Sequence, residues 1–136
     1  MSREIILKFP GGKRVDAVMK GFTIKTDQPV YQGGEGSSPA PFDLFLASIA
    51  TCAGIYLLSF CQNRNISTED LGFIMTKEID KDKKMIKRLN MEIQLPPDFP
   101  KKYEKAVVNA VNQCSVKQHM LEPPEFQLNL SYKDGK

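Results

Sequence analysis

The chain has 136 residues, of which 41% are hydrophobic and 26% are charged. This is the size and composition of one soluble globular domain, so we predict a single domain over residues 1–136. The net charge of +3 is too small to indicate a nucleic acid or an anionic membrane as a partner. Three Cys do not make a secreted disulfide framework, and one His leaves a zinc site short of ligands. No metal or cofactor is therefore expected.

The first residues also bear on the location of the protein. They are charged and lack the apolar run of a signal peptide. We therefore expect a cytoplasmic protein, whose thiols stay free until something oxidises them.

Three short strands are predicted in the first part of the chain. Apolar side chains alternate over residues 5–9, and residues 14–19 and 22–26 form two more such runs after glycine-containing turns. Residues 28–38 hold several glycines, which permit positive φ or a close backbone approach. We therefore expect a loop between the third strand and the next element.

One long apolar helix is predicted from Pro41 to about Arg64. Pro41 suits the first helical turn, and the carboxylate of Asp43 favours the positive end of a helix. The apolar run of residues 44–60 falls short of the about 20 residues that span a bilayer. A helix that is apolar on all sides must be buried, and in so small a domain one sheet covers only one side. We therefore predict a homodimer rather than a membrane protein.

The second half of the chain is predicted to contain two strands, a helix and a final strand. The strands are residues 71–79 and 89–95, and an amphipathic helix over residues 101–114 places Cys114 on its core-facing side. Apolar side chains alternate again over residues 126–132. The order β-β-β-α-β-β-α-β, with short turns between strands, indicates an α+β fold with antiparallel pairing.

A basic hairpin lies between the two strands of the second half. Such charge could serve a nucleic-acid surface, but no aromatic side chains interleave with it, and Asp80 and Asp82 dilute it. We interpret it as a solvated hairpin. Its basic residues are Lys77, Lys81, Lys83, Lys84, Lys87 and Arg88.

Two thiols are the candidate reactive groups. Cys52 lies within the long helix, and Cys114 follows 62 residues later at the end of the second helix. A thiolate is a nucleophile, whereas a buried thiol can equally be a small apolar packing group. Cys61, nine residues after Cys52, faces the other side of the helix and is interpreted as structural. His119, the only His, is either a general base or a surface residue.

The set of motifs around these thiols resembles the OsmC/Ohr family. The matching features, with their spacings, are a glycine-rich loop, Pro41-Phe42-Asp43-Leu44, Ala50-Thr51-Cys52 and Cys114-Ser115-Val116. The resemblance covers nearly the whole chain. It implies an OsmC-like fold, in which an antiparallel sheet packs on a long central apolar helix and two copies intertwine as a homodimer with active sites at their interface.

The resemblance also implies roles for individual residues. Cys52 would attack an organic hydroperoxide as the peroxidatic thiol, and Cys114 would resolve the sulfenic acid as a disulfide that a dithiol then reduces. The activating cation of the family follows a Gly-Gly turn, where this chain has Lys13 and Arg14. We favour Arg14, because Arg is always charged and can hold a thiolate and a peroxide oxygen together.

One position departs from the peroxidase branches of the family. Those branches carry a Glu ten residues before the first Cys, and this chain has Phe42 there. The neighbouring Asp43 lies nine residues before Cys52, which on an ideal helix points to the opposite side. The chain is in this respect more similar to the less characterised OsmC-like branch.

The function predicted from the sequence is a thiol-dependent peroxidase that reduces organic hydroperoxides in oxidative-stress defence. One alternative is an OsmC-like dimer without peroxidase turnover that binds a small apolar or electrophilic ligand between its subunits. Another is a persulfide carrier that uses Cys52.

Overall fold

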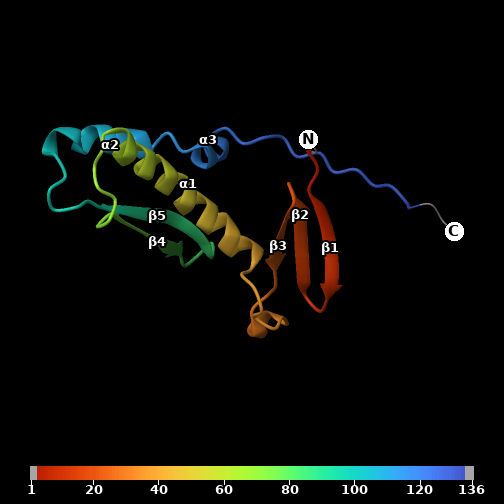
Figure 1. Ribbon diagram of the computed structural model, residues 1–136. Coiled ribbons are helices and arrows are strands. Elements are labelled where there is room, and N and C mark those ends of the chain that lie inside the picture. The colour runs from red at the N-terminus through yellow and green to blue at the C-terminus, as the bar shows by residue number, and fades with distance from the viewer. Residues whose placement is uncertain (1–2, 134–136) are drawn as a thin grey trace. The chain divides into compact units, whose positions relative to one another are not determined.

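The computed structural model describes residues 3–133 and confirms the α+β class with antiparallel sheets (Figure 1). A three-stranded sheet comes first, a long helix follows, and a two-stranded hairpin and two shorter helices complete the order. The elements are β1 (Ile6–Gly11), β2 (Arg14–Met19), β3 (Phe22–Thr26), η1 (Val30–Gln32), α1 (Pro41–Asn63), β4 (Gly72–Asp80), β5 (Met85–Gln94), η2 (Lys101–Tyr103), α2 (Glu104–Val111) and α3 (Ser115–Leu121).

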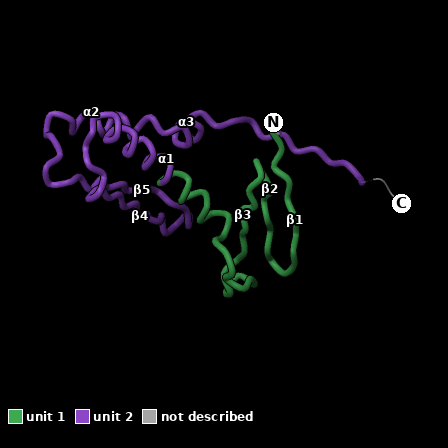
Figure 2. Tube along the Cα trace, viewed as in Figure 1, with its two compact units in different colours: residues 1–50 green, residues 51–136 purple. Residues whose placement is uncertain are grey.

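The chain divides into two compact units, Met1–Ala50 and Thr51–Lys136 (Figure 2). The boundary falls inside α1, so this helix belongs to both units. The single domain expected from the sequence stays a prediction.

Unit 1 is built on the antiparallel sheet β1-β2-β3. Ala17 at the centre of β2 faces Leu7 on one side and Ile24 on the other. Large apolar side chains of this sheet are more than half exposed, among them Phe9 at 75% and Phe22 at 68%. A sheet buries its apolar face against another layer, and this sheet has large apolar surface left to cover.

The glycine-rich loop of unit 1 is ordered by one buried carboxylate. Asp27, only 1% exposed, accepts hydrogen bonds from the backbone N–H groups of Gln28 (2.7 Å), Glu35 (3.3 Å) and Ser37 (3.0 Å), and from the Ser37 hydroxyl (2.6 Å). Gly34 must be glycine, because a Cβ there would overlap the Gln28 carbonyl. The hydrogen bonds from Ser37, and then that from Gln28, lower the pKa of Asp27 to about 2.

The long helix α1 begins as its sequence predicts. The Asp43 carboxylate accepts a hydrogen bond from the Ala40 backbone N–H at 2.9 Å, half of a capping box. By length and composition alone α1 could also cross a membrane. Its side chains Ala53, Leu57, Phe60 and Cys61 are instead buried in the core of unit 2, as in a core helix.

The core of unit 2 joins α1 to α2. Val107 and Val111 of α2 are buried in one cluster with the α1 side chains, and Phe60 meets Tyr103 edge to face with ring centroids 5.9 Å apart. The Arg64 guanidinium lies 3.6 Å from the centroid of the Phe60 ring, which closes this end of the core. The two helices are therefore held in a fixed packing.

The structure corrects two expectations about the C-terminal third. The helix expected over residues 101–114 is a 3-10 turn followed by α2, and Cys114 lies just before a further helix, α3. The prediction of a final strand over residues 126–132 was wrong for the single chain. This segment is extended but pairs with no strand within residues 3–133, and Phe126, Leu128, Leu130 and Tyr132 are 92–99% exposed. A strand needs a neighbouring strand for its backbone hydrogen bonds.

We predict that Asp27 makes the protein sensitive to acid. Its pKa in the folded state lies below the value of about 3.9 in an unfolded chain, so its stabilisation is complete above pH 4 and is lost as the pH falls towards 2. Asp27→Asn should lower Tm at neutral pH by roughly 5 °C and flatten the fall of Tm between pH 4 and pH 2, measured by circular dichroism. The exposed Asp70→Asn serves as the control. Equal acid profiles for the two variants would contradict this role of Asp27.

Candidate thiol site

Two free thiols of unit 2 lie in contact, Cys52 on α1 and Cys114 at the start of α3. Cys114 precedes the first residue of α3 with extended dihedrals (φ −49°, ψ 123°) and forms no side-chain cap to that helix. Its thiol is therefore free to form a hydrogen bond with Cys52. The structure brings together these two residues of the predicted site; their catalytic roles stay predictions.

The surroundings of Cys52 favour its thiolate. Burial acts to raise the pKa of Cys52, but hydrogen bonds from the Cys114 side chain, the Val116 backbone, and the hydroxyl and backbone of Ser115 outweigh it and lower the pKa below its usual value. Cys52 is also partly exposed. A partly exposed thiol with a lowered pKa is the environment of a reactive cysteine.

The surroundings of Cys114 have the opposite effect. Cys114 is 2% exposed, and burial together with its hydrogen bond to Cys52 raises the pKa of its thiol. Because Cys114 retains its proton, it can donate to the Cys52 thiolate. The pKa of Cys52 is thus lowered and that of Cys114 is raised. When one of the two thiols is ionised, the remaining proton therefore stays on Cys114.

Sequence reasoning missed Ser115 as part of this site. Its Oγ lies 3.7 Å from the Sγ of Cys52, and the Nδ1 of His119 lies 2.7 Å from its carbonyl oxygen. Ser is common at the beginning of a helix, so the residue type gave no signal. The usable signal was its position next to a candidate resolving Cys.

The expected activating cation lies in unit 1. Arg14 is exposed at the start of β2, and its Nε donates to the Gly11 carbonyl at 3.3 Å. The Lys13 side chain lies beside Gly33 of the glycine-rich loop. The thiols belong to unit 2. Activation of Cys52 by Arg14 or Lys13 therefore stays a prediction.

Cys61 was interpreted as a structural residue, and its burial agrees with this interpretation. It is fully buried in the core cluster of unit 2, and burial raises the pKa of its thiol, although Arg64 acts in the opposite direction. Its thiol packs as a small apolar group.

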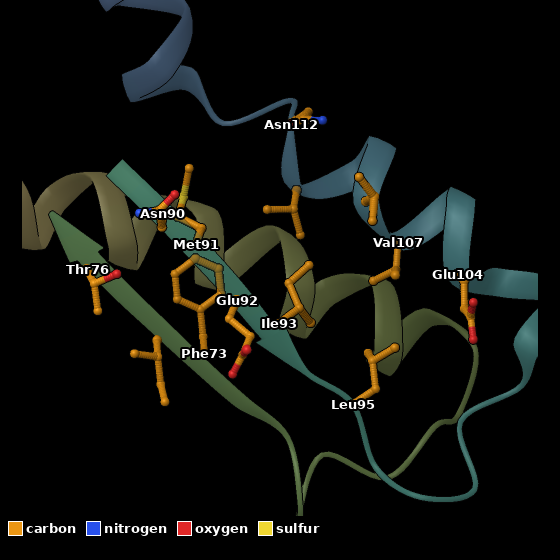
Figure 3. A pocket seen from close by; sticks show the side chains of 13 residues that line it. Phe73, Thr76, Asn90, Met91, Glu92, Ile93, Leu95, Glu104, Val107 and Asn112 are labelled. Atoms are coloured by element: carbon orange, nitrogen blue, oxygen red, sulfur yellow. The ribbon is translucent and has the colours of Figure 1, made fainter. Parts of the chain in front are cut away.

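A separate groove of about 910 Å³ lies between α2 and the β4–β5 hairpin (Figure 3). Phe73, Met91 and Ile93 of the hairpin and Val107 of α2 give it apolar walls, and Glu92 and Glu104 lie among the residues that line it. Neither Cys52 nor Cys114 lines it. The groove and the thiol pair are thus two separate features of unit 2.

Metal chemistry has no donor set in the described part of the chain. No group of three His, Cys, Asp or Glu side chains gathers there. The site consists of two thiols, of which Cys52 has a lowered pKa and Cys114 a raised pKa. The protein is therefore an α+β protein with a pair of thiols at its candidate site.

The family model of OsmC-like proteins matches residues 34–129, which include both thiols. The match spans more than half of the chain, so the protein belongs to the OsmC family. The resemblance inferred from the motifs is thereby confirmed. A search of the curated proteins matches none of them.

Solved structures show the same fold. A protein of Psychrobacter arcticus assigned to the osmotic stress and detoxification response has a TM-score of 0.69 at 22% identity, covering 84% of this chain and 85% of that one. A hypothetical protein of Aquifex aeolicus gives 0.62 at 18% identity, with 90% and 89% covered. The organic hydroperoxide resistance protein OsmC of Legionella pneumophila gives 0.52 at 22% identity, with 86% and 88% covered.

We predict that the three thiols differ in their reaction with iodoacetamide in the native state. Cys52, partly exposed and with a lowered pKa, should react first, whereas Cys114 and Cys61 should be at least about ten-fold slower. Peptide mass analysis after timed alkylation measures the order. The unfolded protein, in which all three react alike, is the control. Equal native rates for Cys52 and Cys61 would contradict the assignment.

Proposed function

We propose that the protein is a thiol-dependent peroxidase that reduces organic hydroperoxides through Cys52 and Cys114. The observation that carries this proposal is the contact between the two thiols, in which the pKa of Cys52 is lowered and that of Cys114 is raised. The likeness to a hydroperoxide resistance protein supports it at the level of the family.

The chemistry needs two steps. In the first, the Cys52 thiolate attacks the terminal oxygen of a hydroperoxide: an S–O bond forms, the O–O bond breaks, and the alkoxide leaves and takes up a proton as the alcohol. In the second, the Cys114 sulfur attacks the sulfenic acid: an S–S bond forms and water leaves. Two thiols are oxidised, one hydroperoxide is reduced, and an external dithiol regenerates the pair by exchange.

The buried state of Cys114 fits its place as the second thiol. While Cys52 is a thiolate, its negative charge and its hydrogen bond keep the proton on Cys114. Once Cys52 is a neutral sulfenic acid, that charge is gone and Cys114 can lose its proton. Since Cys114 is only 2% exposed, Cys52 is its natural partner rather than a molecule from solution.

The proposal also covers the substrate, the activation of Cys52 and the location of the protein. Apolar side chains one turn from Cys52, such as Ile55 and Tyr56, favour an organic hydroperoxide over hydrogen peroxide. Activation of Cys52 by the Arg14 guanidinium is a further part of the proposal. The reductant is a small or protein dithiol of the cytoplasm.

We also propose that the working form is an intertwined homodimer. Apolar surface of α1 remains exposed at Phe42 (54%) and Ile55 (52%), and large apolar side chains of the β1-β2-β3 sheet are exposed too. Residues 126–132 form an alternating segment without a partner strand among residues 3–133. A second copy of the chain supplies a cover for all three features, because symmetric pairs present the same surface twice.

A second candidate function is suggested by the groove beside α2. Its volume of about 910 Å³ and its apolar walls suit a small apolar ligand. In this alternative the protein binds a ligand and does not turn over peroxide. The thiol pair favours the peroxidase, since ligand binding in the groove would not require it.

We predict that an organic hydroperoxide converts the thiol pair into a disulfide. One equivalent of cumene hydroperoxide should form a Cys52–Cys114 bond in the wild type, seen by peptide mass analysis, and dithiothreitol should sustain turnover. Cys52→Ser should abolish turnover, at least about 10³-fold. Cys114→Ser should stop at the sulfenic acid and then over-oxidise. Cys61→Ser is the matched control and should behave as the wild type.

The contrary result is a Cys52 thiol that survives stoichiometric peroxide in folded wild-type protein. If, in addition, a fluorescent fatty acid binds saturably to both the wild type and Cys52→Ser, the binding function replaces the peroxidase.

We predict that residues 126–132 contribute to the dimer. The wild type should have about twice the 15.3 kDa mass of the chain by sedimentation. Leu128→Lys places a charge among the apolar positions of this segment and should weaken association at least about ten-fold. Asn129→Lys, on the opposite side of an extended chain, is the matched control. A monomeric wild type, or equal effects of both variants, would contradict the proposal.

A further inference from the structure

Ser115 contacts the atom that is expected to react. Its Oγ lies 3.7 Å from the Sγ of Cys52, across 63 positions of sequence. A thiolate carries no proton, so in the ionised state only the hydroxyl can donate in this contact. Hydrogen bonding to the charged form of a group favours that form.

We propose that Ser115 is a catalytic residue whose hydroxyl donates to the Cys52 thiolate, so that Cys52 is activated from residues 114–116 of its own unit. This inference rests on the proposed reactivity of Cys52 but goes beyond it, because it assigns the activation to a side chain outside the expected cation. The thiol of Cys114 and the hydroxyl of Ser115 are then two donors to one sulfur.

The position of Ser115 suits this role. It is the first residue of α3, and the Nδ1 of His119 contacts its carbonyl oxygen at 2.7 Å, one turn further along. Among the described residues, the Ser115 hydroxyl contacts the Sγ of Cys52. Ser115 is exposed and Cys52 is partly exposed, so neither residue of this contact is buried.

The other ionisable groups near this segment are accounted for. Cys114 is the proton donor described above, and the Lys117 ammonium is 3.0 Å from the Asn112 side-chain oxygen. Tyr56 lies one turn from Cys52 on α1. The contributions that lower the pKa of Cys52 all come from residues 114–116. The structure therefore supplies activation without a cation in unit 2.

The test is the pKa of Cys52, measured without peroxide. The pH dependence of Cys52 alkylation by iodoacetamide, read by peptide mass analysis, gives the value in the wild type and in variants. Ser115→Ala should raise it by about 0.5–1 unit, a three- to ten-fold loss of thiolate below the pKa. Ser115→Thr keeps the hydroxyl and should restore it. Ser115→Asp, which places a like charge at the sulfur, should raise it further than Ala. Ser67→Ala, another exposed Ser of unit 2, should change nothing.

Each outcome decides the proposal. A pKa that is unchanged in folded Ser115→Ala, or raised equally in Ser115→Ala and Ser115→Thr, overturns it. Since alkylation needs no hydroperoxide, a Ser115 effect without peroxidase turnover would refute the proposed function alone. Turnover without a Ser115 effect would refute this inference alone.

Discussion

The packing of α1 against α2 is the interaction on which the thiol site depends. The Phe60 ring meets Tyr103 edge to face, and Val107 is buried in the same cluster as Leu57. Cys114 follows α2 by only three positions, so the packing that fixes α2 also fixes this thiol. Protein interiors are packed like crystals, and a shift of one helix is felt along the other. The hydrophobic core is thus what brings two thiols from distant segments into contact.

The order of the chemistry follows from one shared proton. Two thiolates in contact would repel each other, so ionisation of one thiol disfavours ionisation of the other, and the surroundings decide which thiol ionises first. Cys52 receives hydrogen bonds from residues 114–116 and is partly exposed, whereas Cys114 is buried and donates. In the proposed function, the partly exposed Cys52 is therefore the nucleophile of the resting protein. In the same proposal, the buried Cys114 becomes a nucleophile only after Cys52 has lost its charge.

The elements that the sequence predicts well are those whose pattern needs no distant partner. Alternation places β2 and β3, and an apolar run with Pro41 and Asp43 at its start places α1, to within a residue or two. The segment 126–132 alternates just as clearly, yet it pairs with no strand among residues 3–133, and without a neighbouring strand it forms none. The alternation of apolar side chains shows that a segment can form a strand, whereas a neighbouring strand decides whether it does.

The same distinction applies to the candidate site, where the sequence predicts some residues but not others. Cys52 and Cys114 were found because their residue type carries the chemistry, but Ser115 was not, because a hydroxyl is ordinary until a sulfur lies beside it. The contacts that set the proton of the pair all lie within unit 2, whereas the uncovered apolar sheet lies in unit 1. The location of the proton is thus a property of one chain. The proposed association with a second copy is therefore not needed to explain where the proton of the pair lies.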